Sequence, residues 1–236
     1  ISNKKALYAS KENINEVEKI KSDFCDAARR ANEANFDMLE IHGAHGYLIH
    51  SFFSPLSNFR SDKYGGSLEN RMLLPLEIVK AVRDVWPLKK PLFYRISSSD
   101  YVEGGTTISD NIILVQSLAG LGIDVIDCSS GGISGSPILA KSPIIPGFQV
   151  PYSQKIKEEV NIHTMAVGAI IDAEQAEDII SSNRADLVAI GRELLADPQW
   201  TYKAASKLIP ENAHTYLPKS YSFYLSRRDK WLDRSA

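Results

Sequence analysis

The stretch FDMLEIHGAHGY, residues 36–47, places a short strand candidate directly before a run of glycine, histidine and tyrosine residues. A helical pattern precedes it, because apolar residues recur at three- and four-residue steps between Ile14 and Ala31. Further strand candidates follow at LFYRIS (92–97), VIDC (125–128), HTMAVG (163–168) and LVAIGR (187–192). Short apolar strands that alternate with helices predict parallel pairing and right-handed crossovers, and nearly continuous apolar strands predict that both of their faces are covered.

Capping residues indicate where the helices begin. A Ser, Thr, Asp or Asn before an apolar periodic run is typical of a helix start, above all with Glu or Gln three residues on. These signals place helix starts at Asn13, Ser67, Ser109 and Asp172, and a further helix is expected near 153–160. Gly122 suits the left-handed position after a helix, and Pro75 is expected to kink or split the helix from Ser67 to Trp86. The composition of residues 42–67 predicts a long loop.

Two architectures fit this alternation: an open doubly wound sheet and a barrel. No GxGxxG motif follows any strand candidate, so a Rossmann dinucleotide fold is not supported. About five βα units are present, whereas a closed barrel of this kind needs eight. No linker, short repeat or low-complexity tract divides the chain, and residues 1–236 are expected to form one domain.

The composition excludes several classes of partner. Hydrophobic residues make up 44% of the 236 residues and charged residues 24%, which is typical of a soluble globular protein. The net charge of −2, with no basic stripe, argues against a nucleic-acid partner, and no apolar run approaches the roughly 18 residues of a membrane helix. Cys25 and Cys128 are expected to be buried thiols in a reducing, cytoplasmic compartment. The absence of an initial Met suggests a processed product or a fragment.

The first strand end carries His42, His45 and Tyr47, which can converge on one small pocket. Imidazole N–H groups can stabilise negative charge that develops on an oxygen, and the Tyr hydroxyl can deliver a proton. Two alternatives remain open for the histidines. They could bind a metal ion if Glu40 or Asp37 supplied a third ligand, or they could be a purely structural pair.

Other strand ends carry cationic and glycine residues. An Arg within an apolar strand, as at Arg95, is costly without a partner, so it binds an anionic ring edge or carboxylate, or pairs with Asp127 or Glu40. The last two strand ends carry Gly168-Ala169 and Gly191-Arg192. Glycine turns and the Arg192 guanidinium at the ends of the final strands favour a phosphate site over a simple turn with a salt bridge.

Several long motifs resemble the Old Yellow Enzyme family of NADH:flavin oxidoreductases. They are EIHGAHGYL (40–48), the SPLSNFRSDKYGGSLENR stretch (54–71), RIS (95–97), SSGG (129–132), GFQVPY (147–152), AVG (166–168) and GRELLADP (191–198). The likeness covers about residues 10–200. It implies a TIM (β/α)8 barrel of which only about strands 4–8 are present, because the chain begins just before the helix that leads into the fourth strand.

The resemblance implies an FMN-dependent ene-reductase that passes a hydride from NADPH or NADH, through FMN, to an activated alkene such as an enone. His42 and His45 would bind the substrate oxygen, and Tyr47 would protonate the α-carbon. Arg95 would face the pyrimidine edge of the flavin, and Ser129 or Ser130 would lie near the flavin or its ribityl chain. The phosphate would be held by Gly168, Ala169, Gly191 and Arg192. Five signature residues would form a network that holds the long loop: Asn58, Arg60, Asp62, Tyr64 and Arg71.

Two alternatives to a working ene-reductase stay open. The chain could be a non-catalytic barrel fragment or one piece of a split protein, or a metal-dependent barrel hydrolase that uses His42 and His45. The expected partner is a small-molecule substrate, and the incomplete barrel adds either self-association or a complementary N-terminal segment.

Overall fold

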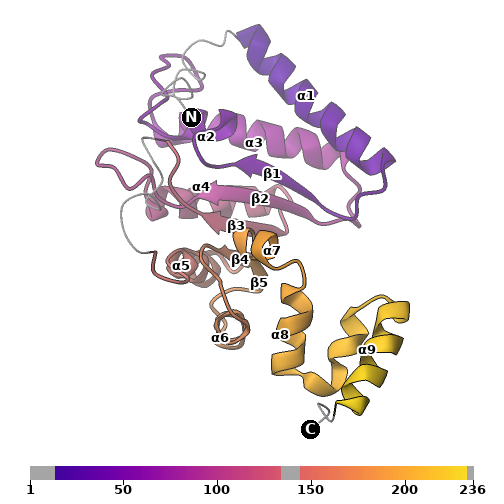
Figure 1. Cartoon of the computed structure of the whole chain (residues 1–236). Coiled ribbons are helices and arrows are strands. Elements are labelled where there is room, and N and C mark those ends of the chain that lie inside the picture. The colour runs from indigo at the N-terminus through magenta and orange to yellow at the C-terminus, as the bar shows by residue number, and fades with distance from the viewer. Residues whose placement is uncertain (1–13, 134–143, 233–236) are drawn as a thin grey trace.

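A computed structural model describes residues 14–133 and 144–232, and its centre is a parallel five-stranded sheet (Figure 1). The strands are β1 (Leu39–Gly43), β2 (Leu92–Ser97), β3 (Val125–Ser129), β4 (His163–Val167) and β5 (Leu187–Ala189). Their order in the sheet is β1-β2-β3-β4-β5. A doubly wound sheet reverses its strand order at a switch point, whereas this order never reverses. The described sheet therefore matches consecutive strands of a barrel, as the resemblance predicts.

Helices join successive strands and pack beside the sheet (Figure 1). Helix α1 (Ile14–Glu33) leads into β1, and the helices that connect successive strands are α3 (Leu68–Val85), α4 (Ile108–Gly120), α5 (Val150–Val160) and α6 (Ala173–Ser181). Shorter or later elements are α2 (Leu48–Phe53), α7 (Arg192–Ala196), α8 (Trp200–Leu208), the 3-10 helix η3 (Pro210–Tyr216) and α9 (Lys219–Trp231). Helix α8 packs on α6 and η3, and α9 packs on η3, so the last helices extend away from the sheet.

Burial is uneven across the sheet. All five residues of β3 are buried, and the main core joins strand residues such as Ile41, Tyr94 and Ile126 to Trp86 and the apolar faces of α1, α3 and α4. A smaller cluster packs β4 against α5 and α6. Leu187 on β5 is 41% exposed, because β5 pairs with β4 alone among the described strands. Coverage of both faces, expected for every strand, therefore holds at the centre of the sheet and is wrong for β5.

Several expected boundaries are confirmed. Strand β2 has the expected bounds, Ser67 caps α3 by accepting a bond from Asn70 N–H, and Gly122 has φ +88° just after α4. Asp172 caps α6, although the Gln175 side chain bonds to the N–H of Ile171 and not to that of Asp172. The proposed cap at Asn13 lies outside the described residues.

Four other expectations are wrong. The cap of α4 is Thr107, not Ser109, since Thr107 and Asp110 form a reciprocal capping box. Helix α3 runs unbroken through Pro75, which is buried, so the expected split at this residue is wrong. The expected loop contains α2, a helix too short for a periodic signal. The first strand begins later and the last strand ends earlier than expected.

The two cysteines are both free, but their environments differ. Cys128 is buried, as expected, whereas Cys25 is only half-buried. Burial raises the pKa of each thiol, and for Cys128 the neighbouring carboxyl of Asp127 adds to the increase. Over the described part of the chain, no helix is long and apolar enough to cross a membrane.

Candidate active site

His42, His45 and Tyr47 lie together at the C-terminal end of β1. The ring centroids of His42 and His45 are 5.3 Å apart, and those of His42 and Tyr47 are 5.4 Å apart. Both histidines are half-buried, and Tyr47 is 47% exposed. The structure thus brings the three residues into one cluster, where imidazole and phenol groups can reach the same small polar ligand.

The turn that carries His45 has a strained backbone. His45 has φ +58° and Gly46 has φ +71°. A left-handed non-glycine residue costs roughly 1–3 kcal/mol and persists only where its surroundings hold it. A Cβ on Gly46 would lie 2.3 Å from the carbonyl oxygen of Gly132, and one on Gly132 would lie 2.4 Å from the Cα of His45. The histidine turn and the SSGG turn therefore touch at a distance that only glycine allows.

Serine side chains from the next strands hold the same turn. The N–H of His45 donates to Ser97 Oγ (2.9 Å), which in turn donates to the carbonyl of Gly131 (2.8 Å). His45 Nε2 lies 2.6 Å from Ser129 Oγ. Ser129, predicted from the sequence as a flavin contact, is thus a direct neighbour of the predicted substrate-binding histidine.

Gln149 links the serines to β4, although the sequence patterns gave it no role. Its Oε1 accepts hydrogen bonds from Ser130 Oγ and, at 3.4 Å, from Ser129 Oγ. Its Nε2 donates to the carbonyl of Val167 (2.9 Å), and its side chain is buried. Tyr101 Oη donates to Ser130 Oγ (2.9 Å). The only signal for Gln149 is its polarity within the otherwise largely apolar GFQVPY motif.

Arg95 pairs with Asp127 on the neighbouring strand. The two residues are in register, and Arg95 Nε lies 3.1 Å from Asp127 Oδ2. Burial raises the pKa of Asp127 to about 7. The positive charge of Arg95 lowers this pKa in part, and the negative charge of Glu40 raises it further. Burial also raises the pKa of Glu40. The alternative of an ion pair with Asp127 is confirmed, and the Arg95 side chain stays 27% exposed.

The expected phosphate residues lie in two turns. Gly168 (φ +115°) and Ala169 (φ +50°) form a left-handed turn whose two carbonyls accept from the N–H of Gly147, each at 3.1 Å. Gly191 precedes α7, and Arg192 is its first residue; both are exposed. Within residues 14–133 and 144–232, Arg192 forms no ion pair. The salt-bridge alternative for this turn therefore has no support in the described chain.

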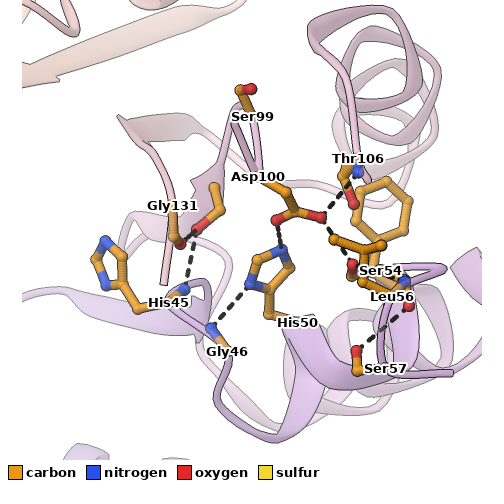
Figure 2. A network of polar contacts seen from close by, with 12 residues as sticks. His45, Gly46, His50, Ser54, Leu56, Ser57, Ser99, Asp100, Thr106 and Gly131 are labelled. Carbon is orange, nitrogen blue, oxygen red and sulfur yellow. Dashed lines mark hydrogen bonds and ion pairs between the residues drawn. The ribbon is translucent and has the colours of Figure 1, made fainter. Parts of the chain in front are cut away.

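A buried pair, His50 and Asp100, was missed by the sequence patterns. His50 Nε2 lies 3.1 Å from Asp100 Oδ1, and both side chains are fully buried (Figure 2). Asp100 Oδ2 accepts from Ser54 Oγ (2.7 Å) and from the N–H of Thr106 (2.8 Å). Although burial acts to raise it, the pKa of Asp100 lies below its usual value because His50, Ser54 and Thr106 stabilise the carboxylate.

The five signature residues form the expected loop network. Asn58 Nδ2 donates to the carbonyls of Phe52 (2.5 Å) and Tyr64 (2.7 Å). Arg60 pairs with Asp62 at 2.5 Å, and Arg71 Nε donates to the carbonyl of Phe53 (2.9 Å). Tyr64 Oη donates to Glu77 Oε2 (3.0 Å). These contacts support the structural interpretation of the motif.

The metal alternative needs a third ligand beside His42 and His45. Among the residues that the structure describes, no group of three or more His, Cys, Asp or Glu side chains is arranged to hold a metal ion. Neither Asp37 nor Glu40 therefore completes such a site with the two histidines.

Parallel βα units in consecutive order, with polar side chains at the C-terminal strand ends, are typical of proteins of the (β/α)8-barrel class. The sequence model of the NADH:flavin oxidoreductase / NADH oxidase family matches residues 2–211. The chain belongs to this family, and the Old Yellow Enzyme resemblance is confirmed at that level.

Relatives and solved structures agree with this assignment. The chain is 48% identical to an NADPH dehydrogenase of Clostridium acetobutylicum over 88% of its own length and 59% of the relative's. Identity to an NADPH dehydrogenase of Bacillus subtilis is also 48%, over 83% of this chain and 57% of that protein. Morphinone reductase in complex with tetrahydroNAD is similar in structure, with a TM-score of 0.64 and 27% identity, over 86% of this chain and 50% of the other. The chain thus spans less than two thirds of the curated relatives it matches.

Proposed function

We propose that this chain provides the substrate-binding and phosphate-binding part of an FMN-dependent ene-reductase that uses NADPH or NADH. The observation that carries the proposal is the cluster of His42, His45 and Tyr47 at the strand-end rim that also holds Arg95. Relatives named NADPH dehydrogenase and a structural neighbour solved with tetrahydroNAD support a nicotinamide reductant. The proposed substrate is an activated alkene such as an enone.

The histidine pair binds the substrate. His42 and His45 donate hydrogen bonds to the carbonyl oxygen of the enone and stabilise the negative charge that develops there. The contact with Ser129 Oγ orients the His45 ring. Tyr47, exposed beside His42, gives its hydroxyl proton to the α-carbon. When bound, FMN supplies the hydride that adds to the β-carbon, after taking it from the nicotinamide.

Other residues at the rim suit the charges of FMN. Arg95, fixed by Asp127 and still partly exposed, is suited to the electron-rich pyrimidine edge. One carboxylate oxygen, Asp127 Oδ1, is buried without a hydrogen-bond partner in the described chain, as expected where a further polar group completes a site. Ser129 and Ser130 lie beside this edge of the sheet. Arg192, which is exposed and follows Gly191 at the start of α7, is proposed to bind the phosphate together with Gly168 and Ala169.

The barrel also needs more strands than the described residues provide. Strands β1 and β5 each have one neighbour within residues 14–133 and 144–232. Either a second copy of the chain or a complementary N-terminal segment would cover these edges. The free cysteines are consistent with a reducing compartment, and we place the protein in the cytoplasm.

The test compares the chain alone with the chain mixed with the N-terminal segment of the Clostridium acetobutylicum relative. FMN binding is followed by quenching of flavin fluorescence, and turnover by enone-dependent oxidation of NADPH. We expect strong FMN binding and turnover in the mixture. Absence of FMN binding in both samples would overturn the proposal and favour a non-catalytic fragment. Hydrolytic activity that depends on an added metal ion would favour the hydrolase.

A further inference from the structure

The His50–Asp100 pair connects two separate segments of the chain. His50 lies in α2, and Asp100 lies in the loop after β2 (Figure 2). Asp100 also accepts from Ser54, the residue that ends α2, and from the N–H of Thr106, while its own N–H donates to the Thr106 carbonyl (3.0 Å). One buried carboxylate therefore fixes both α2 and the loop that follows β2.

The hydrogen bonds allow only one form of the His50 ring. The N–H of Gly46 donates to His50 Nδ1 at 2.9 Å, so Nδ1 is an acceptor and carries no proton. The ring proton is then on Nε2, which faces Asp100 Oδ1 at 3.1 Å. The contact is an ion pair without hydrogen-bond geometry, and neither atom has a hydrogen-bond partner within the described chain. Asp100 thus holds His50 in the tautomer that accepts from the backbone.

The backbone group that His50 accepts from lies inside the strained turn. Gly46 follows the left-handed residue His45 and precedes Tyr47. Ser97 holds the N–H of His45, and Ser129 contacts its ring. The Gly46 N–H, bound to His50, is a further fixed point, and it lies between the two side chains that we propose to act on the substrate. The N–H of Tyr47 also donates to the carbonyl of Ala44 (3.2 Å).

We infer that His50 is a positioning residue: its neutral ring, oriented by Asp100, fixes the left-handed turn that directs His45 and Tyr47 towards the substrate oxygen and α-carbon. This role rests on the proposed function, which identifies the substrate atoms that His45 and Tyr47 face. The held conformation of the turn is a property of this chain alone, and it is measurable without cofactor or substrate.

Two variants of His50 separate its two contacts. His50→Asn places an amide oxygen where Nδ1 lies and keeps an acceptor for Gly46. His50→Gln places an amide nitrogen where Nε2 lies and keeps a donor for Asp100. Ser57→Ala is the matched control, since the two hydrogen bonds that Ser57 Oγ donates within the described chain go to the carbonyls of Ser51 and Ser54, away from the turn.

The first readout is amide hydrogen exchange of the peptide that contains Gly46, measured on the chain complemented with the N-terminal segment, without FMN or substrate. We expect exchange in His50→Gln to rise by about tenfold, the effect of losing one hydrogen bond of ordinary net strength. Exchange in His50→Asn and Ser57→Ala should stay close to that of the unmodified chain. Equal exchange, or equal loss of structure, in the Asn and Gln variants would overturn the inference.

The second readout uses the complemented, FMN-loaded protein. His50→Gln should raise KM for the enone and lower kcat at unchanged FMN affinity, and His50→Asn should restore both. If amide exchange follows the expected pattern but no sample turns over the enone, the result supports the hold of His50 on the turn and contradicts the proposed function. The expected exchange pattern with equal kinetics in both variants would overturn the positioning role.

Discussion

Arg95 on β2 and Asp127 on β3 are opposite each other in register, and they form a cross-strand ion pair with one half-exposed and one buried partner. Because burial outweighs the attraction of Arg95, the pKa of Asp127 rises from 3.8 to about 7. The folded chain then binds a proton more tightly than the unfolded chain. This carboxyl contributes stability below pH 3.8, and the contribution is lost as the pH rises towards 7.

Asp127→Asn should remove this pH dependence. Between about pH 4 and pH 8, the free energy of unfolding of the unmodified chain should fall, relative to that of the variant, by on the order of a few kcal/mol. Urea unfolding at a series of pH values measures the difference. Parallel stability curves for the two proteins would show that burial of Asp127 does not control its titration.

Tyr47→Phe should slow the second half of the reaction only. If Tyr47 is the proton donor, enone reduction should slow by about 10²–10⁴-fold, while flavin reduction by NADPH stays nearly unchanged. Stopped-flow absorbance on the complemented protein separates the two steps. Tyr221→Phe, exposed on α9, is the control. An equal loss in both steps would contradict the assignment.

Arg192→Ala should weaken FMN retention. The variant loses a charge-assisted contact to the phosphate, worth about 1.5–3 kcal/mol, or roughly ten- to a hundredfold in affinity. Equilibrium dialysis of the complemented protein against FMN gives the affinity, and Arg227→Ala on α9 controls for the loss of a positive charge. Unchanged affinity would mean that Arg192 serves the turn and not the cofactor.

Thr107→Ala and Ser109→Ala test the start of α4 directly. Thr107 accepts a bond from the N–H of Asp110 and is the observed cap, whereas Ser109 lies exposed within the helix. Loss of the cap should lower the free energy of unfolding by about 0.5–2 kcal/mol. The Ser109 variant should stay within about 0.5 kcal/mol of the unmodified chain. The reverse order would restore the sequence-based assignment.

The helix and strand boundaries show which local features the sequence predicts well and which it does not. Strand β2 and the cap at Ser67 were predicted correctly because apolar runs and capping signals act over a few neighbouring residues. The cap at Ser109 was wrong because several Ser and Thr residues compete there. Thr107 is selected by the Asp at the third helical position, which completes a box with a shorter acid than Glu.

The sequence predicted the cluster of His42, His45 and Tyr47, but not the buried polar residues that hydrogen-bond to the segments around it. His42, His45 and Tyr47 follow one strand, so their proximity follows from chain order. His50 and Asp100 are 50 residues apart in sequence, and Gln149 meets Ser129 only after β3 and β4 pair. Buried polar pairs of this kind have no local pattern, because their partners are set by tertiary packing.

The unmodified chain, expressed by itself, should self-associate or aggregate and bind FMN poorly. Strands β1 and β5 have one neighbour each in the described structure, and unpaired edges recruit other strands. Adding the N-terminal segment as a separate polypeptide should reduce association and restore yellow colour. Light scattering coupled to gel filtration measures the mass, and absorbance in the flavin bands measures the bound cofactor.

A charged side chain on the open edge of β5 should also reduce self-association. Leu187 on β5 is 41% exposed, so Leu187→Lys should shift association to higher protein concentration by setting like charges against each other at the edge. Leu195→Lys on α7, where the side chain is 84% exposed and lies outside the sheet, should have little effect. A monomeric chain with stoichiometric FMN would contradict the role of the open edges, because the ring would then be enclosed without any further strand.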